Sequence, residues 1–202
     1  MTIDAETRLL AAIAYGESST ADVYEEMAAL ASVMVRQQKA RGYDSIQTFV
    51  AKRTSFSFVV KDGNKRYTKL MKATEKDIGQ STAMSDAVRA ARNALAGGVD
   101  YSNGAYFWDG ADIKTHYAAH AKVNAGIHFT KPEHNIYDIK GSEGKYEYSI
   151  KIRKKSKGRI FTEKKIIGYF PYTYESTAAA GGTIFWKLGD QWLKISKGRE
   201  YI

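Results

Sequence analysis

Cysteine is absent from this chain of 202 residues, and proline occurs only at Pro132 and Pro171. Without cysteine the chain has no disulfide and no cysteine-ligated metal, and it can work in a reducing or an oxidising compartment. No apolar run approaches the ~18 residues that a membrane-spanning helix requires. The N-terminus has neither the basic nor the apolar region of a signal peptide, so we expect no export by the Sec route.

Several catalytic signatures are also missing. The sequence has no glycine-rich phosphate loop, no recognisable set of serine, histidine and aspartate, and no cysteine nucleophile. His116 and His120 are spaced to share one helix face, as zinc ligands do, but the glutamate that zinc proteases carry after the first histidine is absent. A solvated or hydrogen-bonded pair is the alternative. We therefore expect no metal and no cofactor.

The positive charge is concentrated in the last third of the chain. Residues 141–202 contain 13 Lys and Arg against 6 Asp and Glu, a net charge of +7, whereas residues 1–140 carry +2. A localised positive field suits a polyanion, which could be nucleic acid, an acidic membrane surface or an anionic cell-wall polymer. A solvated lysine-rich hairpin is the alternative.

Periodicity predicts an α+β fold in two lobes that pack as one unit. In residues 1–140, helical spacing predicts helices at 7–15, from Ser19 or Thr20 to before Gly42, at 46–50 and at 84–96. The first helix has Asp4 or Thr2 as its N-cap, and the run 54–60 is predicted as a loop or a short strand. In residues 141–202, alternation predicts a small antiparallel sheet with strands at 146–152, 166–174 and 183–195.

The end of the first helix carries the strongest chemical signal. There the segment Tyr15-Gly16-Glu17-Ser18 places a carboxyl group where an apolar helix face meets a polar break. Burial disfavours the charged form and raises the pKa of a glutamate, which suits a general acid. The alternative is that Glu17 sits beside the N-terminus of the next helix, which would stabilise the anion and lower the pKa.

Four blocks of sequence resemble the spore cortex-lytic cell-wall hydrolase family in order and spacing, over roughly residues 5–130. The blocks are Tyr15-Gly16-Glu17-Ser18, the alanine-rich segment 27–36, Ser55-Phe56-Ser57, and the segment 93–107 with Asn103-Gly104-Ala105-Tyr106-Phe107. The chain departs from the family pattern at Ser18, where the family has alanine, and at Val35, where it has asparagine. A packing or substrate contact can differ at these two positions.

The resemblance implies a lysozyme-like fold for residues 1–140 and cleavage of peptidoglycan glycan strands between N-acetylmuramic acid and N-acetylglucosamine. Glu17 matches the catalytic glutamate of the family. Glu26 is the favoured second catalytic carboxylate, with Glu25 or Asp109 as alternatives, although Glu26 can also be an ordinary solvated residue of a first helical turn. Attack by the sugar's own 6-hydroxyl, as in lytic transglycosylation, would need no second carboxylate. The expected substrate contacts are Ser57, Tyr101, Asn103 and Tyr106.

Some antibacterial toxins delivered by type VI secretion carry lysozyme-like domains without signal peptides, and this chain looks compatible with that route, with a phage enzyme or with a fused wall hydrolase. We expect it to act in the periplasm or cell wall on peptidoglycan, with an immunity protein as a further partner and no membrane span. The alternative is a basic module without catalysis that binds wall polymer or nucleic acid through the basic, tyrosine-rich residues 146–169. Nucleic acid is the less favoured partner.

Overall fold

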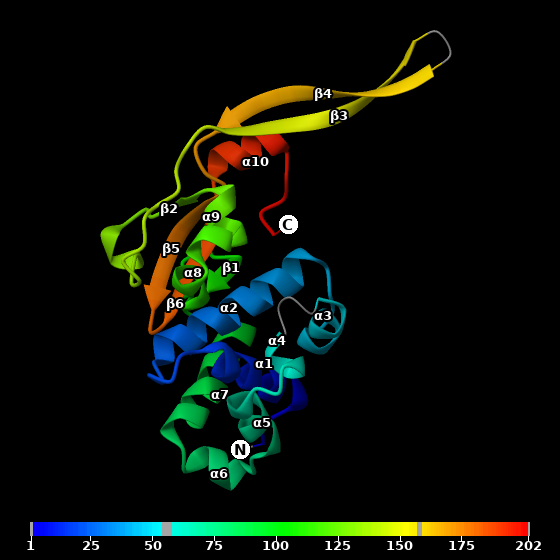
Figure 1. Cartoon of the computed structure of the whole chain (residues 1–202). Coiled ribbons are helices and arrows are strands. Elements are labelled where there is room, and N and C mark those ends of the chain that lie inside the picture. Colours follow the sequence, from blue (N-terminus) through cyan, green and yellow to red (C-terminus); the bar gives the residue numbers. More distant parts are fainter. Residues whose placement is uncertain (1, 54–57, 157–158, 202) are drawn as a thin grey trace.

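The computed structural model describes residues 2–53, 58–156 and 159–201, and it shows the expected α+β class (Figure 1). The first part of the chain forms the helices α1 (Ala5–Glu17), α2 (Tyr24–Ala40), α3 (Ile46–Lys52), α4 (Phe58–Lys61), α5 (Lys65–Lys72), α6 (Glu75–Gly79) and α7 (Thr82–Leu95). Shorter elements follow: β1 (Phe107–Asp109), α8 (Asp112–Thr115), η2 (Tyr117–Ala119), α9 (Ala121–Ala125), β2 (Ile127–His128) and η3 (Pro132–His134). The last elements are β3 (Tyr146–Ser156), β4 (Arg159–Phe170), β5 (Tyr174–Ala180), β6 (Thr183–Leu188) and α10 (Asp190–Ser196).

Helix α1 begins and is buried as its sequence predicts. The carboxylate of Asp4 caps it by accepting a hydrogen bond from the Thr7 N–H at 2.8 Å. Leu10 and Ile13 lie in the core, where α1 packs against α2, α5 and α7. The helix continues to Glu17, two residues past the predicted end, so the candidate acid belongs to its last turn.

Helix α2 crosses the core but starts later than predicted. Its N-cap is Val23, which makes no side-chain capping bond, because the hydroxyl of the predicted cap Ser19 is bonded to Glu26 instead. Helical spacing predicts an apolar stripe of Val23, Met27, Leu30 and Met34. The last three are fully buried, whereas Val23 precedes the helix and is half-buried.

The segment between α3 and α7 is more helical than its sequence predicts. Residues 54–57 of the predicted loop or strand lie outside the described residues, and the remainder of that run belongs to α4. Helices α5 and α6 are not predicted, although both have side-chain caps, from Asn64 and from the capping box of Thr74 and Asp77. Short helices of this kind present too few turns for periodicity to detect them.

A four-stranded sheet in the order β1-β6-β5-β2 connects the two predicted lobes, since β1 and β2 come from before residue 140 and β5 and β6 from after it. Strand β6 is antiparallel to β1 and β5, and β2 is parallel to β5. Side chains alternate along β6. Phe185 enters the helical core, whereas Ile184 and Trp186 enter a second apolar cluster beneath α8 and α9.

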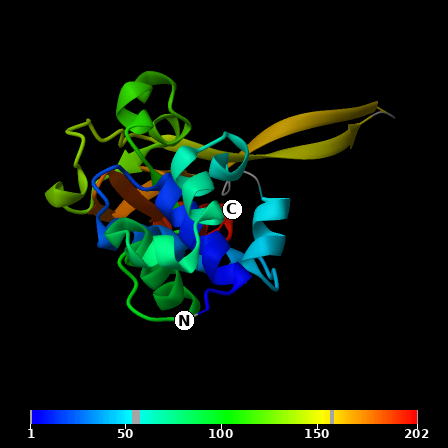
Figure 2. The same cartoon turned by 90° about the horizontal axis from the view of Figure 1, so that it is seen from below.

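Strands β3 and β4 form a separate antiparallel hairpin that projects from the body of the molecule (Figures 1 and 2). Helix α10 packs against the base of β4. The predicted strand 183–195 is therefore wrong in its second half, because β6 ends at Leu188 and α10 follows. In the part of the chain that the structure describes, no helix has both the length and the apolar character needed to cross a bilayer.

Candidate active site

The last turn of α1 is fixed by two side chains from the region around α5. Arg66 donates from Nε to the Tyr15 carbonyl at 2.7 Å and stacks on the Tyr15 ring, and Asn64 donates to the Gly16 carbonyl at 3.0 Å. These donors satisfy carbonyls that a helix end leaves unpaired, and the Arg66 cation complements the negative end of the helix dipole. The backbone that carries Glu17 is thereby held in place.

Gly16 allows the chain on the other side of Glu17 to approach closely. A Cβ at this position would lie 2.4 Å from Cγ2 of Val59 and 3.1 Å from Cβ of Tyr67. Because glycine has no such atom, α4 can pack directly on the end of α1. The backbone N–H of Val59 then donates a hydrogen bond to the Glu17 carboxyl group.

The surroundings of Glu17 raise its pKa above the ordinary value of 4.5. Burial is the largest cause, since it disfavours the charged form. The indole N–H of Trp108 and the N–H of Val59 oppose it as hydrogen-bond donors, whereas the negative charges of Asp62 and Asp112 raise the pKa further. The net direction is the one that a general acid needs.

A charged cluster lies next to Trp108, on the other side of strand β1. The buried Asp109 carboxylate accepts from Lys122 Nζ at 2.7 Å and faces His120 Nε2 at 3.4 Å, and the same His120 nitrogen lies 3.5 Å from Asp112. The hydrogen bond to Asp109 raises the pKa of His120, against the opposing effect of burial. Asp112 is the solvent-facing member, with 57% of its side chain exposed.

Three members of this cluster, Asp109, Asp112 and His120, have ligand atoms close enough together to hold a cation. However, Lys122 already supplies a positive charge to Asp109, and the raised pKa of His120 favours a second one. The residues therefore fit a balanced ion-pair cluster better than a metal site. The helical spacing of His116 and His120 is not realised, because α8 ends at Thr115 and His120 has extended backbone angles.

Glu26 is fully buried and its carboxylate serves as a hydrogen-bond acceptor for four donors. Oε1 accepts from the N–H of Ser19 at 3.1 Å, the N–H of Gly182 at 3.0 Å and the hydroxyl of Thr183 at 2.7 Å. Oε2 accepts from the Ser19 hydroxyl at 2.7 Å. The turn between β5 and β6 approaches so closely that a Cβ at Gly181 would lie 2.2 Å from Oε2. In this structure Glu26 joins the α1–α2 loop to the sheet, and neither solvent nor a substrate can contact it.

The structure does not gather the expected substrate contacts around Glu17. Ser57 lies outside the described residues. The ring of Tyr101 packs edge-on against Tyr24, and Asn103 donates to the Thr177 carbonyl at 3.2 Å. Among the described residues, no hydrogen bond, ion pair or ring contact joins Tyr101 or Asn103 to Glu17.

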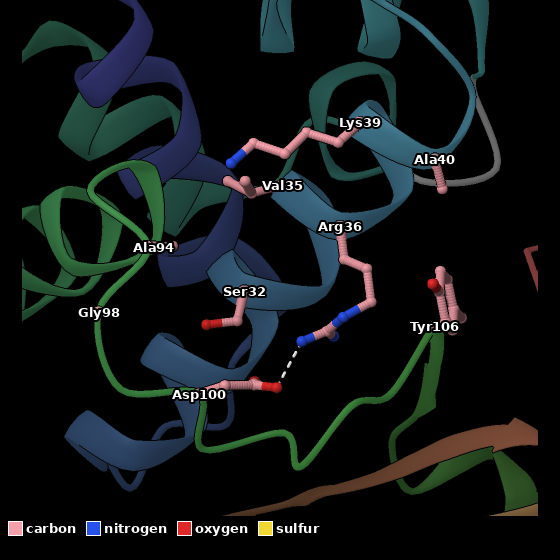
Figure 3. Close-up of a pocket in the computed structure, with 10 residues that line it drawn as sticks. Ser32, Val35, Arg36, Lys39, Ala40, Ala94, Gly98, Asp100 and Tyr106 are labelled. Atoms are coloured by element: carbon pink, nitrogen blue, oxygen red, sulfur yellow. Dashed lines mark hydrogen bonds and ion pairs between the residues drawn. The ribbon is translucent and has the colours of Figure 1, made fainter.

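Tyr106 lines a different hollow, a pocket of about 570 Å³ between α2, α7 and the loop that precedes β1 (Figure 3). Arg36 reaches from α2 into this pocket, pairs with Asp100, donates to Ser102 Oγ at 3.2 Å and lies against the Tyr106 ring. Arg36 lies ten residues beyond Glu26, or about 15 Å further along the helix axis. The pocket is thus removed from the start of α2, where the chain leaves Glu17.

Asp62 and Asp112, whose charges act on Glu17, were not identified from the sequence as parts of its site, and neither was the cluster that joins Asp112 to His120. The sequence also places Trp108 among the aromatic side chains that would line a sugar-binding groove, without assigning it a contact. No spacing signal relates these residues to Glu17, because Asp62 follows α4 and the others come from β1 and from the short elements after it, whereas Glu17 ends α1. The aromatic and acidic run 106–109 beside a glycine was the available hint.

No family model, no curated protein and no solved structure matches this chain. The geometry around Glu17 is therefore the main observation that bears on its function.

Proposed function

We propose that this protein cleaves the glycan strands of peptidoglycan, as a muramidase or a lytic transglycosylase, with Glu17 as the general acid. The observation that carries the proposal is the environment of Glu17: a partly buried carboxyl group with a raised pKa on a rigid helix end, bonded by the N–H groups of Trp108 and Val59. The family resemblance of the four sequence blocks supports the choice of substrate.

The two donors suit a group that must change charge during the reaction. Protonated Glu17 gives its proton to the glycosidic oxygen as the bond to the anomeric carbon breaks and that carbon becomes oxocarbenium-like. The carboxylate that remains is stabilised by hydrogen bonds from Trp108 and Val59, which favour the anion. In the second half of the reaction the same carboxylate takes a proton from the attacking hydroxyl.

Asp62 and Asp112 are exposed carboxylates whose charges act on Glu17, Asp62 more strongly. We propose Asp112 for a second role in the reaction because it belongs to the charged cluster beside Trp108. It is exposed, it lies beside His120, and its charge acts on Glu17. Asp109 is less suited because it is buried and paired with Lys122, and Glu26 is sealed. In a muramidase Asp112 would orient the attacking water. In a lytic transglycosylase the 6-hydroxyl of the muramic acid attacks and no second carboxylate is required.

The proposal is tested by incubating purified peptidoglycan sacculi with wild type, Glu17→Gln and Asp112→Asn, and by identifying soluble products by mass spectrometry. We expect release by wild type and none by Glu17→Gln. Products with reducing ends that are no longer released by Asp112→Asn would identify a muramidase. Products with anhydromuramic ends that Asp112→Asn still releases would identify a lytic transglycosylase. Equal release by Glu17→Gln would refute the acid role.

The second candidate is a wall-binding module without catalysis, favoured by the basic projecting hairpin. This candidate would be established if the sacculi adsorb both wild type and Glu17→Gln and neither protein releases soluble product. For the catalytic protein we propose action in the periplasm or cell wall, with delivery by a secretion system, a phage or a larger protein and an immunity protein as its antagonist.

A further inference from the structure

The hairpin of β3 and β4 displays apolar side chains that the rest of the molecule does not cover. Eight large apolar side chains are exposed in the described part of the chain, and six of them belong to β4 and the middle of β3. They are Ile150, Ile160, Phe161, Ile166, Ile167 and Tyr169. Ile160 is 70% exposed, the highest value in this set, and it lies towards the distal end of the hairpin. Such a concentration of exposed apolar area is typical of a docking surface.

Within the described residues, the hairpin is anchored to the body of the molecule at its base. There the Tyr146 hydroxyl donates to the Ser142 carbonyl at 2.6 Å, and Gly168 lies against Ile195 of α10. Beyond the base both strands extend away from the body, as the two views in Figures 1 and 2 show. The distal part is therefore free to contact a surface larger than the molecule itself.

Positive charge accompanies the apolar side chains. Both acidic residues of the hairpin are already paired, Glu147 with Lys164 and Glu163 with Lys154. The other described cations of the hairpin have no acidic partner within the described residues: Lys151, Arg153, Lys155 and Lys165. The free charge of this arm is thus strongly positive, and it complements an anionic surface.

Apolar and cationic side chains are paired across the strands. Ile150 lies opposite Lys165, Phe161 opposite Lys154, and Ile160 opposite Lys155. Opposite residues of an antiparallel pair point to the same face, so each of these three apolar side chains has a lysine beside it. Ile150 and Phe161 lie on one face of the hairpin and Ile160 on the other. A lysine can lay its alkyl stem along an apolar neighbour and extend its ammonium group to a phosphate.

We infer that the hairpin docks on an anionic lipid bilayer, inserting its distal isoleucine and phenylalanine side chains among the headgroups while its lysines bind lipid phosphates. A nucleic acid would bind the lysines and could stack on Phe161 and Tyr169, but it would gain nothing from the four exposed isoleucines, since stacking on bases needs aromatic rings. An anionic wall polymer likewise offers no apolar phase. The inference is independent of the proposed function.

The test is co-sedimentation of the full chain with vesicles of phosphatidylcholine alone or mixed with phosphatidylglycerol. We expect binding only to the mixed vesicles, weakening as salt is raised. Removing two charges in Lys151→Gln with Arg153→Gln should weaken binding on the order of 25-fold, at about fivefold per charge. Removing apolar area in Ile160→Ser with Phe161→Ser should weaken it by at least about tenfold.

Matched controls lie elsewhere on the surface. Val99→Ser changes an apolar side chain that is 61% exposed, and Lys65→Gln with Lys69→Gln removes two charges from α5, far from the hairpin (Figure 1). These variants and Glu17→Gln should bind vesicles as wild type does. Unchanged thermal unfolding of every variant shows that the fold is intact.

Three results would overturn the inference. The first is no binding to the mixed vesicles. The second is vesicle binding that is weakened by the charge variant but not by the apolar variant, together with binding to duplex DNA as strong as to the mixed vesicles. That result would make the hairpin a general polyanion site. The third is a dimer in light scattering that the apolar variant dissociates, which would assign the exposed side chains to a second copy of this chain.

Discussion

Replacing Glu26 separates a structural role from a catalytic one. In Glu26→Ala, the N–H of Gly182 and the hydroxyl of Thr183 lose their acceptor in a buried place, and each unpaired donor costs about 1–3 kcal/mol. Ser19 is partly exposed and can turn to water, and relief from burying a charge offsets part of the loss. We expect a net destabilisation of about 3 kcal/mol, or about 6–12 °C in Tm for a chain of this size.

Glu26→Gln should cost less, about 1 kcal/mol, because the amide oxygen can replace Oε1 and the Ser19 hydroxyl can reverse to accept from the amide nitrogen. Urea unfolding followed by circular dichroism measures both values, with Glu25→Gln on the exposed side of the same turn as the control. The reasoning fails if Glu26→Ala unfolds like wild type. It also fails if Glu26→Gln keeps full stability but loses peptidoglycan cleavage, which is the signature of a catalytic carboxylate.

Three further variants probe the surroundings of Glu17. Glu17→Gln should raise Tm at neutral pH. Folding raises the pKa of Glu17 above its unfolded value of about 4.5, so protonated Glu17 contributes stability that is fully present below pH 4.5 and is lost as the pH rises through the folded pKa. Glutamine stays uncharged and does not lose this stability. This gain should vanish in thermal melts at acid pH, and a Tm gain that is the same at every pH would contradict it. Trp108→Phe removes a hydrogen-bond donor that favours the Glu17 anion, so the pKa of Glu17 should rise further. The alkaline limb of the pH–rate profile should then move to higher pH. A shift to lower pH would show that Trp108 does not stabilise the anion. Gly16→Ala should destabilise by about 1–3 kcal/mol because its Cβ meets Val59, whereas Gly79→Ala, which meets nothing, should not, and equal Tm values for the two would rule out the close approach of α4.

Local patterns predicted the longer helices of this fold, α1, α2 and α7, but not the short helices α4, α5 and α6. The stripe of Met27, Leu30 and Met34 and the cap at Asp4 each depend on residues a few positions apart, and the structure has both. The position of Glu17 at the end of α1 follows from the same periodicity. Local information was enough there because helical hydrogen bonds and caps are themselves local.

The rest depends on contacts between distant residues, which one sequence does not reveal. Glu26 accepts hydrogen bonds from Gly182 and Thr183, which are more than 150 positions away in the sequence. Strand β2 has only two residues, too few for alternation to be seen, and its place beside β5 is fixed by tertiary packing. The link between Trp108 and Glu17 has the same long-range origin.

The most direct test of the account is the initial rate at which soluble glycan fragments leave purified peptidoglycan, compared for wild type, Glu17→Gln and Glu25→Gln at equal adsorption to the sacculi. We predict the wild-type rate for Glu25→Gln and a rate at background for Glu17→Gln. If Glu17→Gln releases fragments as fast as wild type, Glu17 is not the acid and the proposed mechanism is wrong.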